Sequence, residues 1–302
     1  MTKDFLSFAP YSRNDLNNIF GLTKWIKGEN PKHFKPLRDK TAALIFEKPS
    51  LRTHVSFEVG ILQLGGQSVY LSGSNIGIST RESVKDVAEV LSQYNDLIVI
   101  RTFSHEVVEQ LAQHASIPVI NALTDLLHPC QVMADAFTLM ERGMFSESTK
   151  VVFVGDGNNM VNSWLELAEK IPFHFVLACP KGYEPDQTIL ARAIKAGVSK
   201  IDIVRDPREA AEGADVFYTD VWVSMGQEAE TEARLKIFPP YQVNSELLAG
   251  ARPGAMVMHC LPAHRGQEIS GEVADGPQSG LWDQSENRLH AQKAVLVRLM
   301  AE

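Results

Sequence analysis

Cysteine is scarce in this chain of 302 residues, which has three: Cys130, Cys179 and Cys260. Their odd number and wide spacing do not suggest a disulfide scaffold, because a chain of this length can build a core without covalent cross-links. We therefore expect reduced thiols and a cytoplasmic protein.

Long apolar runs and an excess of basic residues are also missing. No stretch approaches the roughly 18 apolar residues of a membrane-spanning helix, and the N-terminus lacks the basic start and apolar run of a secretory signal. The 37 Asp and Glu outnumber the 29 Lys and Arg, for a net charge of −8. This balance disfavours a general surface for nucleic acid or anionic membrane. Any site for an anion must therefore be local.

What the chain has is an alternation of short apolar runs with segments of helical spacing. Segments 55–64, 106–114 and 160–170 carry apolar residues at helical intervals and few helix breakers. Such alternation is typical of parallel sheets joined by crossover helices. The expected strands are Thr41–Phe46, Leu97–Arg101, Pro118–Ala122, Val151–Gly155, Phe173–Ala178, Ile201–Val204, Val216–Asp220 and Ala255–Cys260.

The length exceeds that of a typical domain of about 150 residues, which favours two lobes. We expect an α/β fold in which each lobe is a mainly parallel sheet flanked by helices. Residues 1–134 form the first domain, residues 135–285 form the second, and a closing helix at 286–302 crosses back to the first lobe. Before that helix, Gly271–Gly280 is rich in Gly, Pro and acidic residues and is expected to be a loop.

One segment has the features of an anion site. After the strand Thr41–Phe46, Ser50 and Thr53 supply hydroxyl groups at a predicted helix start. The exposed N–H groups and the dipole of a helix start attract phosphate, and Arg52 adds a forked donor. For this segment in isolation, an ordinary N-cap with Arg52 in solvent is the more frequent outcome.

Two further residues could join this anion site. Arg101 ends a predicted strand, at the edge where open α/β sheets bind ligands, although a surface charge is an equal alternative. His128 precedes Pro129, which suits the first turn of a helix, and Gln131 follows closely. There His128 could polarise a carbonyl group, but a capping or core histidine is equally compatible with the pattern.

The segment Gly155–Met160 resembles a dinucleotide-binding turn, but Met160 stands where the third glycine is required, and we reject that interpretation. Asn158 and Asn159 remain as polar side chains suited to an amino-acid substrate, or as plain turn asparagines. Asp220 ends a later predicted strand, with Ser224 and Met225 in the following loop. An acidic group there suits a substrate ammonium, and helix capping is its alternative.

The last such segment places His259 and Cys260 between a predicted strand and a loop containing proline. These residues and His264 do not follow common zinc spacings, so we expect no metal. A covalent thiolate mechanism with His128 or His264 as base is a further possibility, but the sequence shows no such pairing.

Together and in order, seven segments resemble the transcarbamoylase family over nearly the whole chain, on the ornithine rather than the aspartate branch. They are Ser50–Thr53, Arg101–Phe103, His128–Gln131, Gly155–Met160, Asp220–Gly226, His259–Pro262 and Glu286–His290.

The resemblance implies a first domain for carbamoyl phosphate and a second for L-ornithine. It implies catalytic roles for Arg52, Arg101, His128 and Cys260. The implied contacts of carbamoyl phosphate are Ser50, Leu51, Arg52, Thr53, Asn75, Arg101, His128, Gln131, Cys260, Leu261 and Arg288. The implied contacts of ornithine are Asn159, Asp220, Ser224 and Met225.

By the same resemblance, the side-chain amine of ornithine attacks the carbamoyl carbon, phosphate leaves, and citrulline forms without a metal or organic cofactor. A homotrimer or an assembly of trimers is implied, without nucleic-acid or membrane partners. Two positions depart from the family pattern. His54 replaces an arginine, and Asn75 replaces a frequent glutamine in a loop that reaches a neighbouring subunit's site. We expect the His54 side chain to point away from the phosphate.

Two alternatives stay open. The first is a carbamoyltransferase for N-acetylornithine or putrescine, against which Asp220 and Ser224 indicate a free α-amino acid. The second is a catalytically silent homologue that binds carbamoyl phosphate or ornithine for regulation, a hypothesis prompted by His54 and Asn75.

Overall fold

The computed structural model describes residues 2–28, 33–78 and 80–300, apart from the side chains of Ser74 and Asn75. The chain forms two compact units. Unit 1 comprises residues up to Phe137 together with the segment from Glu286 onward, and unit 2 comprises Thr138–Ser285. The division thus falls after residue 137, whereas the sequence placed it after residue 134. The C-terminal segment belongs to unit 1, which confirms the predicted return of the closing helix.

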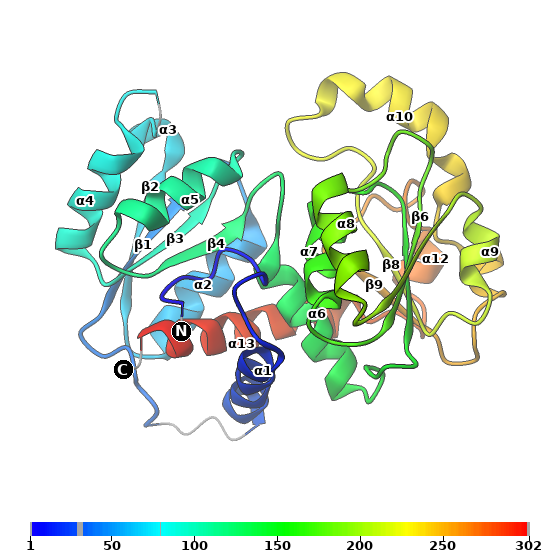
Figure 1. The fold of residues 1–302 in the computed structure, drawn as a ribbon, viewed down its shortest axis with the longest axis horizontal. Coiled ribbons are helices and arrows are strands. Elements are labelled where there is room, and N and C mark those ends of the chain that lie inside the picture. The colour runs from blue at the N-terminus through cyan, green and yellow to red at the C-terminus, as the bar shows by residue number, and fades with distance from the viewer. Residues whose placement is uncertain (1, 29–32, 79, 301–302) are drawn as a thin grey trace. The chain divides into compact units, whose positions relative to one another are not determined.

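Unit 1 contains one sheet of four parallel strands in the order β2-β1-β3-β4 (Figure 1). Its elements are α1 (Arg13–Gly28), β1 (Thr41–Phe46), α2 (Leu51–Gln63), β2 (Gln67–Ser72), α3 (Gly73–Ile76), α4 (Val84–Tyr94), β3 (Leu97–Arg101), α5 (His105–His114), β4 (Val119–Leu123), α6 (Pro129–Glu141) and α13 (Leu281–Met300). Helices α6 and α13 continue along the chain past the points of division.

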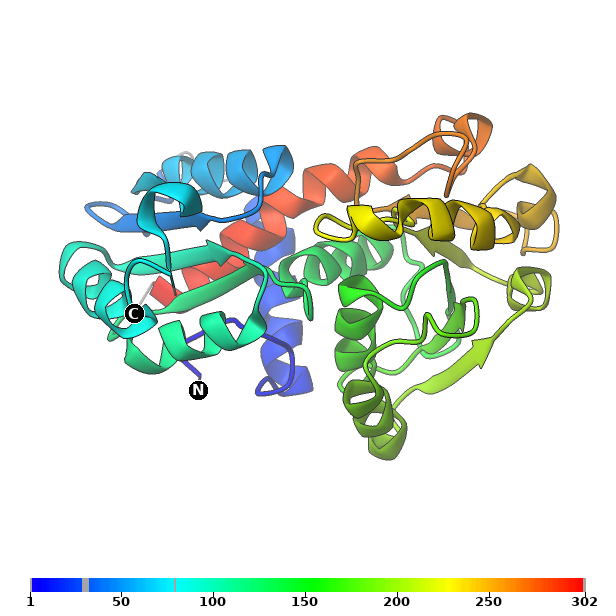
Figure 2. The same ribbon diagram turned by 90° about the horizontal axis from the view of Figure 1, so that it is seen from above.

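Helices cover both faces of this sheet. Apolar side chains of β1 and β3, such as Ala43 and Ile98, pack against α4 and α5 on one face, and α2 covers the other face (Figure 2). Helix α13 packs closely on α2 at Gly60, where a Cβ atom would lie 3.2 Å from Cγ of Lys293. Glycine at position 60 thus permits the close approach of the two helices.

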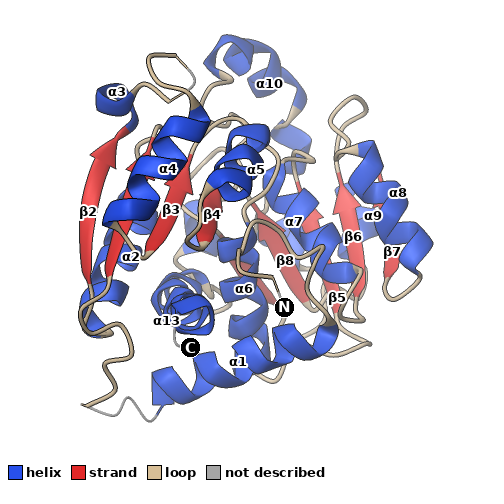
Figure 3. Ribbon diagram, turned by 60° about the vertical axis from the view of Figure 1, so that its left-hand side comes forward, coloured by secondary structure: helices blue, strands red, loops and turns tan. Residues whose placement is uncertain are grey.

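Unit 2 contains a sheet of five parallel strands in the order β7-β6-β5-β8-β9 (Figure 3). Its elements are β5 (Lys150–Val154), α7 (Asn159–Ala168), β6 (His174–Ala178), α8 (Gln187–Ala196), β7 (Lys200–Val204), α9 (Pro207–Ala211), β8 (Val216–Thr219), η1 (Glu228–Glu230), α10 (Thr231–Ile237), η2 (Pro239–Tyr241), α11 (Ser245–Leu248), β9 (Met256–His259) and α12 (Gly271–Ala274).

Two apolar layers hold the second sheet. On one face the buried Trp164 of α7 stacks on Phe175 of β6, with ring centroids 6.3 Å apart. On the other face Val152 and Phe217 belong to a core that includes Ala210 of α9. Burial on both faces explains why these strands read as apolar runs in the sequence.

Some elements differ from the prediction. Strand β2 was missed because its residues are mostly half-exposed or exposed, as an edge strand permits, and its sequence QSVYLS is not an apolar run. Helix α2 begins at Leu51, at the helix start predicted from Ser50 and Thr53, whereas α13 begins at Leu281 rather than Glu286. The expected loop 271–280 contains the short helix α12, capped by the Ser270 side chain. No helix among the described residues is long and apolar enough to cross a membrane.

Each sheet has one point where the strand order reverses. In unit 1 this switch point lies between β1 and β3, and in unit 2 it lies between β5 and β8. Open α/β sheets bind ligands beyond the carboxyl ends of the strands at such points. Ser50, Asn158 and Asp220 follow β1, β5 and β8, and Arg101 is the last residue of β3. The fold thus creates one candidate ligand site in each unit.

Candidate active site

The turn after β1 leads into helix α2, and a serine hydroxyl caps the first turn of that helix. Ser50 is the N-cap of α2, and its side chain accepts a hydrogen bond from the N–H of Thr53 at 3.2 Å. Thr53 is buried, whereas the Leu51 side chain is 73% exposed. Ser50 is the predicted cap. The N–H groups at the N-terminus of α2 are the kind of donors that bind anions.

Arg288 connects this turn to two other elements of unit 1. Its Nη2 donates to Oγ1 of Thr53 at 3.1 Å, and its Nη1 donates to Oε1 of Gln131. The Gln131 amide in turn donates to Asp135 at 2.7 Å. The Arg288 side chain is buried. The structure thus brings Thr53, Gln131 and Arg288 together, as the resemblance implied.

His128 lies within a field of positive charge. Burial lowers its pKa well below the ordinary 6.5, and the guanidinium groups of Arg288, Arg101 and Arg52 lower it further. A neutral imidazole results, which can donate one hydrogen bond to a polarised oxygen. All three arginines are therefore near enough to His128 to act on it electrostatically. An uncharged donor beside three cations suits a ligand with a negatively charged group and a carbonyl group.

Two residues at this site were missed by the sequence analysis. Lys48 is almost fully buried, pairs with Asp125, and lies 4.3 Å from the ring centroid of Phe103. Glu47 accepts a hydrogen bond from the Thr102 hydroxyl. These contacts join the segment after β1 to those after β3 and β4. The only sequence signal was their place directly after a strand, which many surface residues share.

Asp220 is the centre of the candidate site in unit 2. Its Oδ1 accepts a hydrogen bond from the Cys260 thiol at 2.9 Å, and its Oδ2 accepts one from Nδ2 of Asn158 at 2.8 Å. Asn158 also caps α7, since its Oδ1 accepts from the N–H of Met160 at 2.9 Å. The sequence analysis named both Asn158 and Asn159 as suited to an amino-acid substrate, and the resemblance assigned the contact to Asn159. The role of Asn158 in orienting Asp220 was missed.

The two glycines before Asn158 are each required by the local backbone. A Cβ atom on Gly157 would lie 2.4 Å from the backbone nitrogen of Pro185, so no other residue fits there. Gly155 has a φ of 138°, which is available to glycine.

The loop after β8 carries Ser224 and Met225. The Ser224 carbonyl accepts from the N–H of Gln227 at 3.0 Å, and Met225 is 43% exposed. Arg234 of α10 anchors this loop, because its Nη1 donates to the Trp222 carbonyl at 2.8 Å and to Asp156 at 2.7 Å. Asn159 begins α7, where its carbonyl accepts from the Ser163 hydroxyl at 2.9 Å.

His259, Asp220 and Cys260 have ligand atoms within 4.8 Å of one another, a spacing that a metal ion could bridge. Both ring nitrogens of His259 already have protein partners. Nδ1 accepts from the N–H of Leu261 at 2.8 Å, and Nε2 lies 3.0 Å from Oε1 of Glu268. Metal binding here would therefore break an existing hydrogen bond.

The two positions that depart from the family pattern are His54, whose side chain the structure describes, and Asn75, whose side chain it does not. The His54 ring lies 4.3 Å from the ring of Tyr70, between centroids, and its Nε2 lies 3.2 Å from Glu58. It therefore packs toward the edge strand β2. Asn75 lies in α3, and its side chain is outside the described residues.

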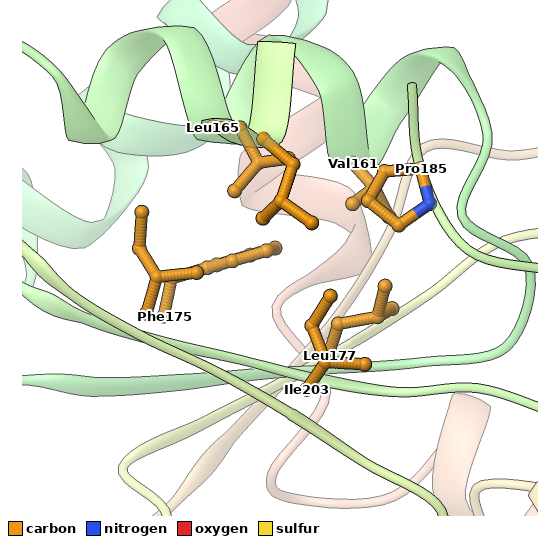
Figure 4. Close-up of a pocket in the computed structure, with 8 residues that line it drawn as sticks. Val161, Leu165, Phe175, Leu177, Pro185 and Ile203 are labelled. Atoms are coloured by element: carbon orange, nitrogen blue, oxygen red, sulfur yellow. The ribbon is translucent and has the colours of Figure 1, made fainter. Parts of the chain in front are cut away.

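An apolar pocket between α7, α8, β6 and β7 is not part of this site. Its lining includes Val161, Leu165, Phe175 and Leu177, whose side chains face one another in Figure 4. A purely apolar lining offers no partner for a phosphate or an ammonium group. It is a packing gap between the helices and the sheet.

Comparisons with known proteins agree with this geometry. The family model of the aspartate/ornithine carbamoyltransferase carbamoyl-P binding domain matches residues 3–141, and that of the Asp/Orn binding domain matches residues 147–299. The ornithine carbamoyltransferase of Chlorobaculum tepidum is 57% identical, over 99% of this chain and 90% of the relative.

Solved structures show the same likeness. The ornithine carbamoyltransferase of Pyrococcus furiosus matches with a TM-score of 0.93 and 46% identity, covering 98% of this chain and 96% of the other. The anabolic enzyme of Campylobacter jejuni matches with a TM-score of 0.94 and 38% identity, covering 99% of both chains. The chain therefore belongs to the aspartate/ornithine carbamoyltransferase family.

Proposed function

We propose that the protein transfers the carbamoyl group of carbamoyl phosphate to the side-chain amine of L-ornithine, giving L-citrulline and phosphate. The observation that carries the proposal is a complementary pair of sites at the two switch points. The site in unit 1 gathers cationic groups around a neutral histidine, and the site in unit 2 centres on the carboxylate of Asp220. One suits a phosphorylated carbonyl compound, and the other suits an amino acid.

The first domain, residues 1–134, binds carbamoyl phosphate. The N-terminus of α2, with Ser50 and Thr53, and the guanidinium groups of Arg52, Arg101 and Arg288 hold the phosphate. His128 donates to the carbamoyl oxygen, and Gln131 positions Arg288. The remaining contacts that we assign to this substrate are Leu51, Asn75, Cys260 and Leu261.

The second domain, residues 135–285, binds ornithine. The Asp220 carboxylate accepts hydrogen bonds from the α-ammonium group. Asn158 and Cys260 set the orientation of that carboxylate. Asn159, Ser224 and Met225 complete the contacts with the amino-acid end. An acetylated α-nitrogen carries no charge for Asp220 to balance, and putrescine has no α-carboxylate, so ornithine fits this site best among the three amines.

In the reaction, the neutral side-chain amine forms a bond to the carbamoyl carbon. The tetrahedral intermediate then breaks its bond to the bridging oxygen, and the electron pair leaves with phosphate. Arg52, Arg101 and His128 stabilise the charge that develops on the carbonyl oxygen and the phosphate. The attacking nitrogen gives up one proton, which the departing phosphate accepts, and Cys260 influences this loss from its place beside Asp220. No step requires a metal or an organic cofactor.

We also propose that the protein is a homotrimer of the cytoplasm. Helix α2 exposes an apolar stripe of Leu51, Val55 and Leu62, and the edge strand β2 exposes Val69 and Tyr70. Exposed apolar side chains on neighbouring elements are typical of subunit interfaces. Light scattering after size exclusion tests this, since Leu62→Glu should yield monomers if the stripe is an interface.

Turnover of three amines with carbamoyl phosphate held constant tests the proposed substrate. Ornithine should exceed N-acetylornithine and putrescine in kcat/KM by at least about 100-fold, because each rival lacks a charged group that the site recognises. A preference for either rival would overturn the assignment. Absence of citrulline from pure protein with both substrates would favour the silent homologue instead.

A further inference from the structure

Glu268 is a buried carboxylate outside the set of residues assigned above. It lies between β9 and α12, and its side chain is fully buried. Its Oε1 accepts from the N–H of His264 at 2.5 Å and lies 3.0 Å from Nε2 of His259. A buried carboxylate is costly unless hydrogen bonds satisfy it, so its presence calls for a reason.

The partner of Glu268, His259, is held on three sides. The backbone N–H of His259 donates to Oε1 of Gln284 at 2.9 Å, and the ring Nδ1 accepts from the backbone N–H of Leu261 at 2.8 Å. Because Nδ1 accepts, the ring hydrogen resides on Nε2 and is donated to Glu268. Glu268 therefore fixes both the tautomer and the rotation of the imidazole ring.

The Leu261 N–H that His259 holds belongs to an unusual backbone. Leu261 has a φ of 59°, in the left-handed region, which a branched side chain rarely adopts. The bond to Nδ1 of His259 holds this conformation. Cys260 lies between the two bonded residues, and its thiol is directed to Asp220 at 2.9 Å. A turned imidazole would thus release the backbone on either side of Cys260.

From this chain of contacts we infer that Glu268 is a positioning residue for ornithine. Acting through His259, it holds the Cys260–Leu261 turn in the geometry that places the thiol beside Asp220. The inference rests on the proposed function for its kinetic consequence, but the geometry of the thiol can be tested without it. Glu268 transfers no proton in this role. The role therefore differs from a relay that passes protons through His259.

Substitutions at position 268 separate these roles. Glu268→Gln keeps an oxygen that accepts from His259 and His264 but removes the charge, whereas Glu268→Ala removes the acceptor. We expect Glu268→Ala to lower kcat/KM for ornithine about 10- to 100-fold, and Glu268→Gln to stay within about threefold of the parent with the same pH profile. KM for carbamoyl phosphate should change less than about twofold in both.

Substitutions at position 259 test the next link. The side-chain oxygen of Asn can replace Nδ1 as acceptor for the Leu261 N–H, whereas Gln can replace Nε2 as donor to Glu268. If the main role of His259 is to accept the hydrogen bond from the Leu261 N–H, His259→Asn retains more activity than His259→Gln. The reverse order would overturn the inference.

Val152→Ala is the matched control for lost stability, because Val152 is buried in β5 of the same unit and its side chain takes no part in the hydrogen bonds that hold the turn. It should lower the unfolding temperature as Glu268→Ala does, yet keep the parent kinetic constants. The rate at which iodoacetamide alkylates Cys260 should change in Glu268→Ala only, whether or not the protein makes citrulline.

The outcomes are distinct. An inactive parent protein contradicts the proposed function, and the alkylation rates still decide the inference. Parent-like kinetics and alkylation in Glu268→Ala would overturn it. A Glu268→Gln variant as defective as Glu268→Ala would also overturn the inference, because the charge would then be essential. An equal loss of activity in Val152→Ala would overturn it as well.

Discussion

The thiol of Cys260 donates a hydrogen bond to Oδ1 of Asp220 across 2.9 Å, although the two residues are 40 positions apart. Strands β8 and β9 are neighbours in the sheet, so their carboxyl ends place both side chains at one edge. Asn158, after the adjacent strand β5, holds the other oxygen of Asp220. The carboxylate is thereby oriented before any substrate arrives, and oriented charge is what an ammonium site requires.

Loss of the Asp220 charge should weaken the recognition of ornithine. Asp220→Asn is expected to lower kcat/KM for ornithine about 100-fold, because a hydrogen bond to a charged group contributes roughly 1.5–3 kcal/mol. N-acetylornithine has no charge on its α-nitrogen, so its slow turnover should change far less. Asp215→Asn, at the amino end of the same strand, is the control, and an equal loss for both amines would contradict the assignment.

Cys260 should be the reactive thiol. Burial raises the pKa of Cys130 to about 12 and that of Cys179 to about 11, and both side chains are almost fully inaccessible, whereas Cys260 is half-buried. Because the thiolate is the reactive form, Ellman's reagent at mildly alkaline pH should give one fast phase. Ornithine should slow this phase and Cys260→Ser should abolish it. A fast phase that persists in Cys260→Ser would refute the prediction.

Removal of the Arg288 side-chain charge should affect one substrate selectively. Arg288→Met loses the bonds to Thr53 and Gln131, and we expect KM for carbamoyl phosphate to rise about 10- to 100-fold. KM for ornithine should change less than about threefold. Steady-state kinetics with each substrate varied in turn measure this, and Arg298→Met near the end of α13 is the control. Equal increases in both KM values would show general damage.

The buried His128 should make stability depend on pH in the acidic range. Its pKa in the folded protein is well below 6.5, through burial and the neighbouring arginines. Below about pH 6.5 the unfolded chain binds a proton that the folded chain does not, so the stability present above this pH is lost as pH falls towards the folded pKa.

Urea unfolding measures this contribution. The free energy of unfolding of the parent protein relative to His128→Gln should fall by up to about 1.4 kcal/mol between about pH 7.5 and pH 5.5. His33, which is exposed, provides the control, because the difference between the parent and His33→Gln should not change in this way. A constant difference for His128→Gln would contradict the predicted neutral imidazole.

The parts of the fold that are apolar on both faces could be predicted from the sequence. Strand β1 reads TAALIF and is nearly all buried, so its pattern was plain. Strand β2 is half-exposed at a sheet edge, and its polar residues concealed it. Position along a strand likewise drew attention to Arg101 and Asp220, since the carboxyl ends of parallel strands bind ligands.

The contacts that orient these residues could not be predicted. Thr53 and Arg288 are 235 positions apart, and Lys48 and Asp125 are 77 apart. Only tertiary packing decides that they meet. Arg288 entered the candidate site through the family resemblance, and Glu268 did not enter it at all, because an isolated acidic residue in a loop has no distinguishing pattern.

The most direct measurement of the central claim uses carbamoyl phosphate labelled with carbon-13 and pure protein. With L-ornithine present, the account predicts labelled citrulline and inorganic phosphate in equal amounts, at a rate proportional to protein concentration and reduced in Asp220→Asn. Phosphate released without labelled citrulline, or label transferred to N-acetylornithine or putrescine in preference to ornithine, would contradict it.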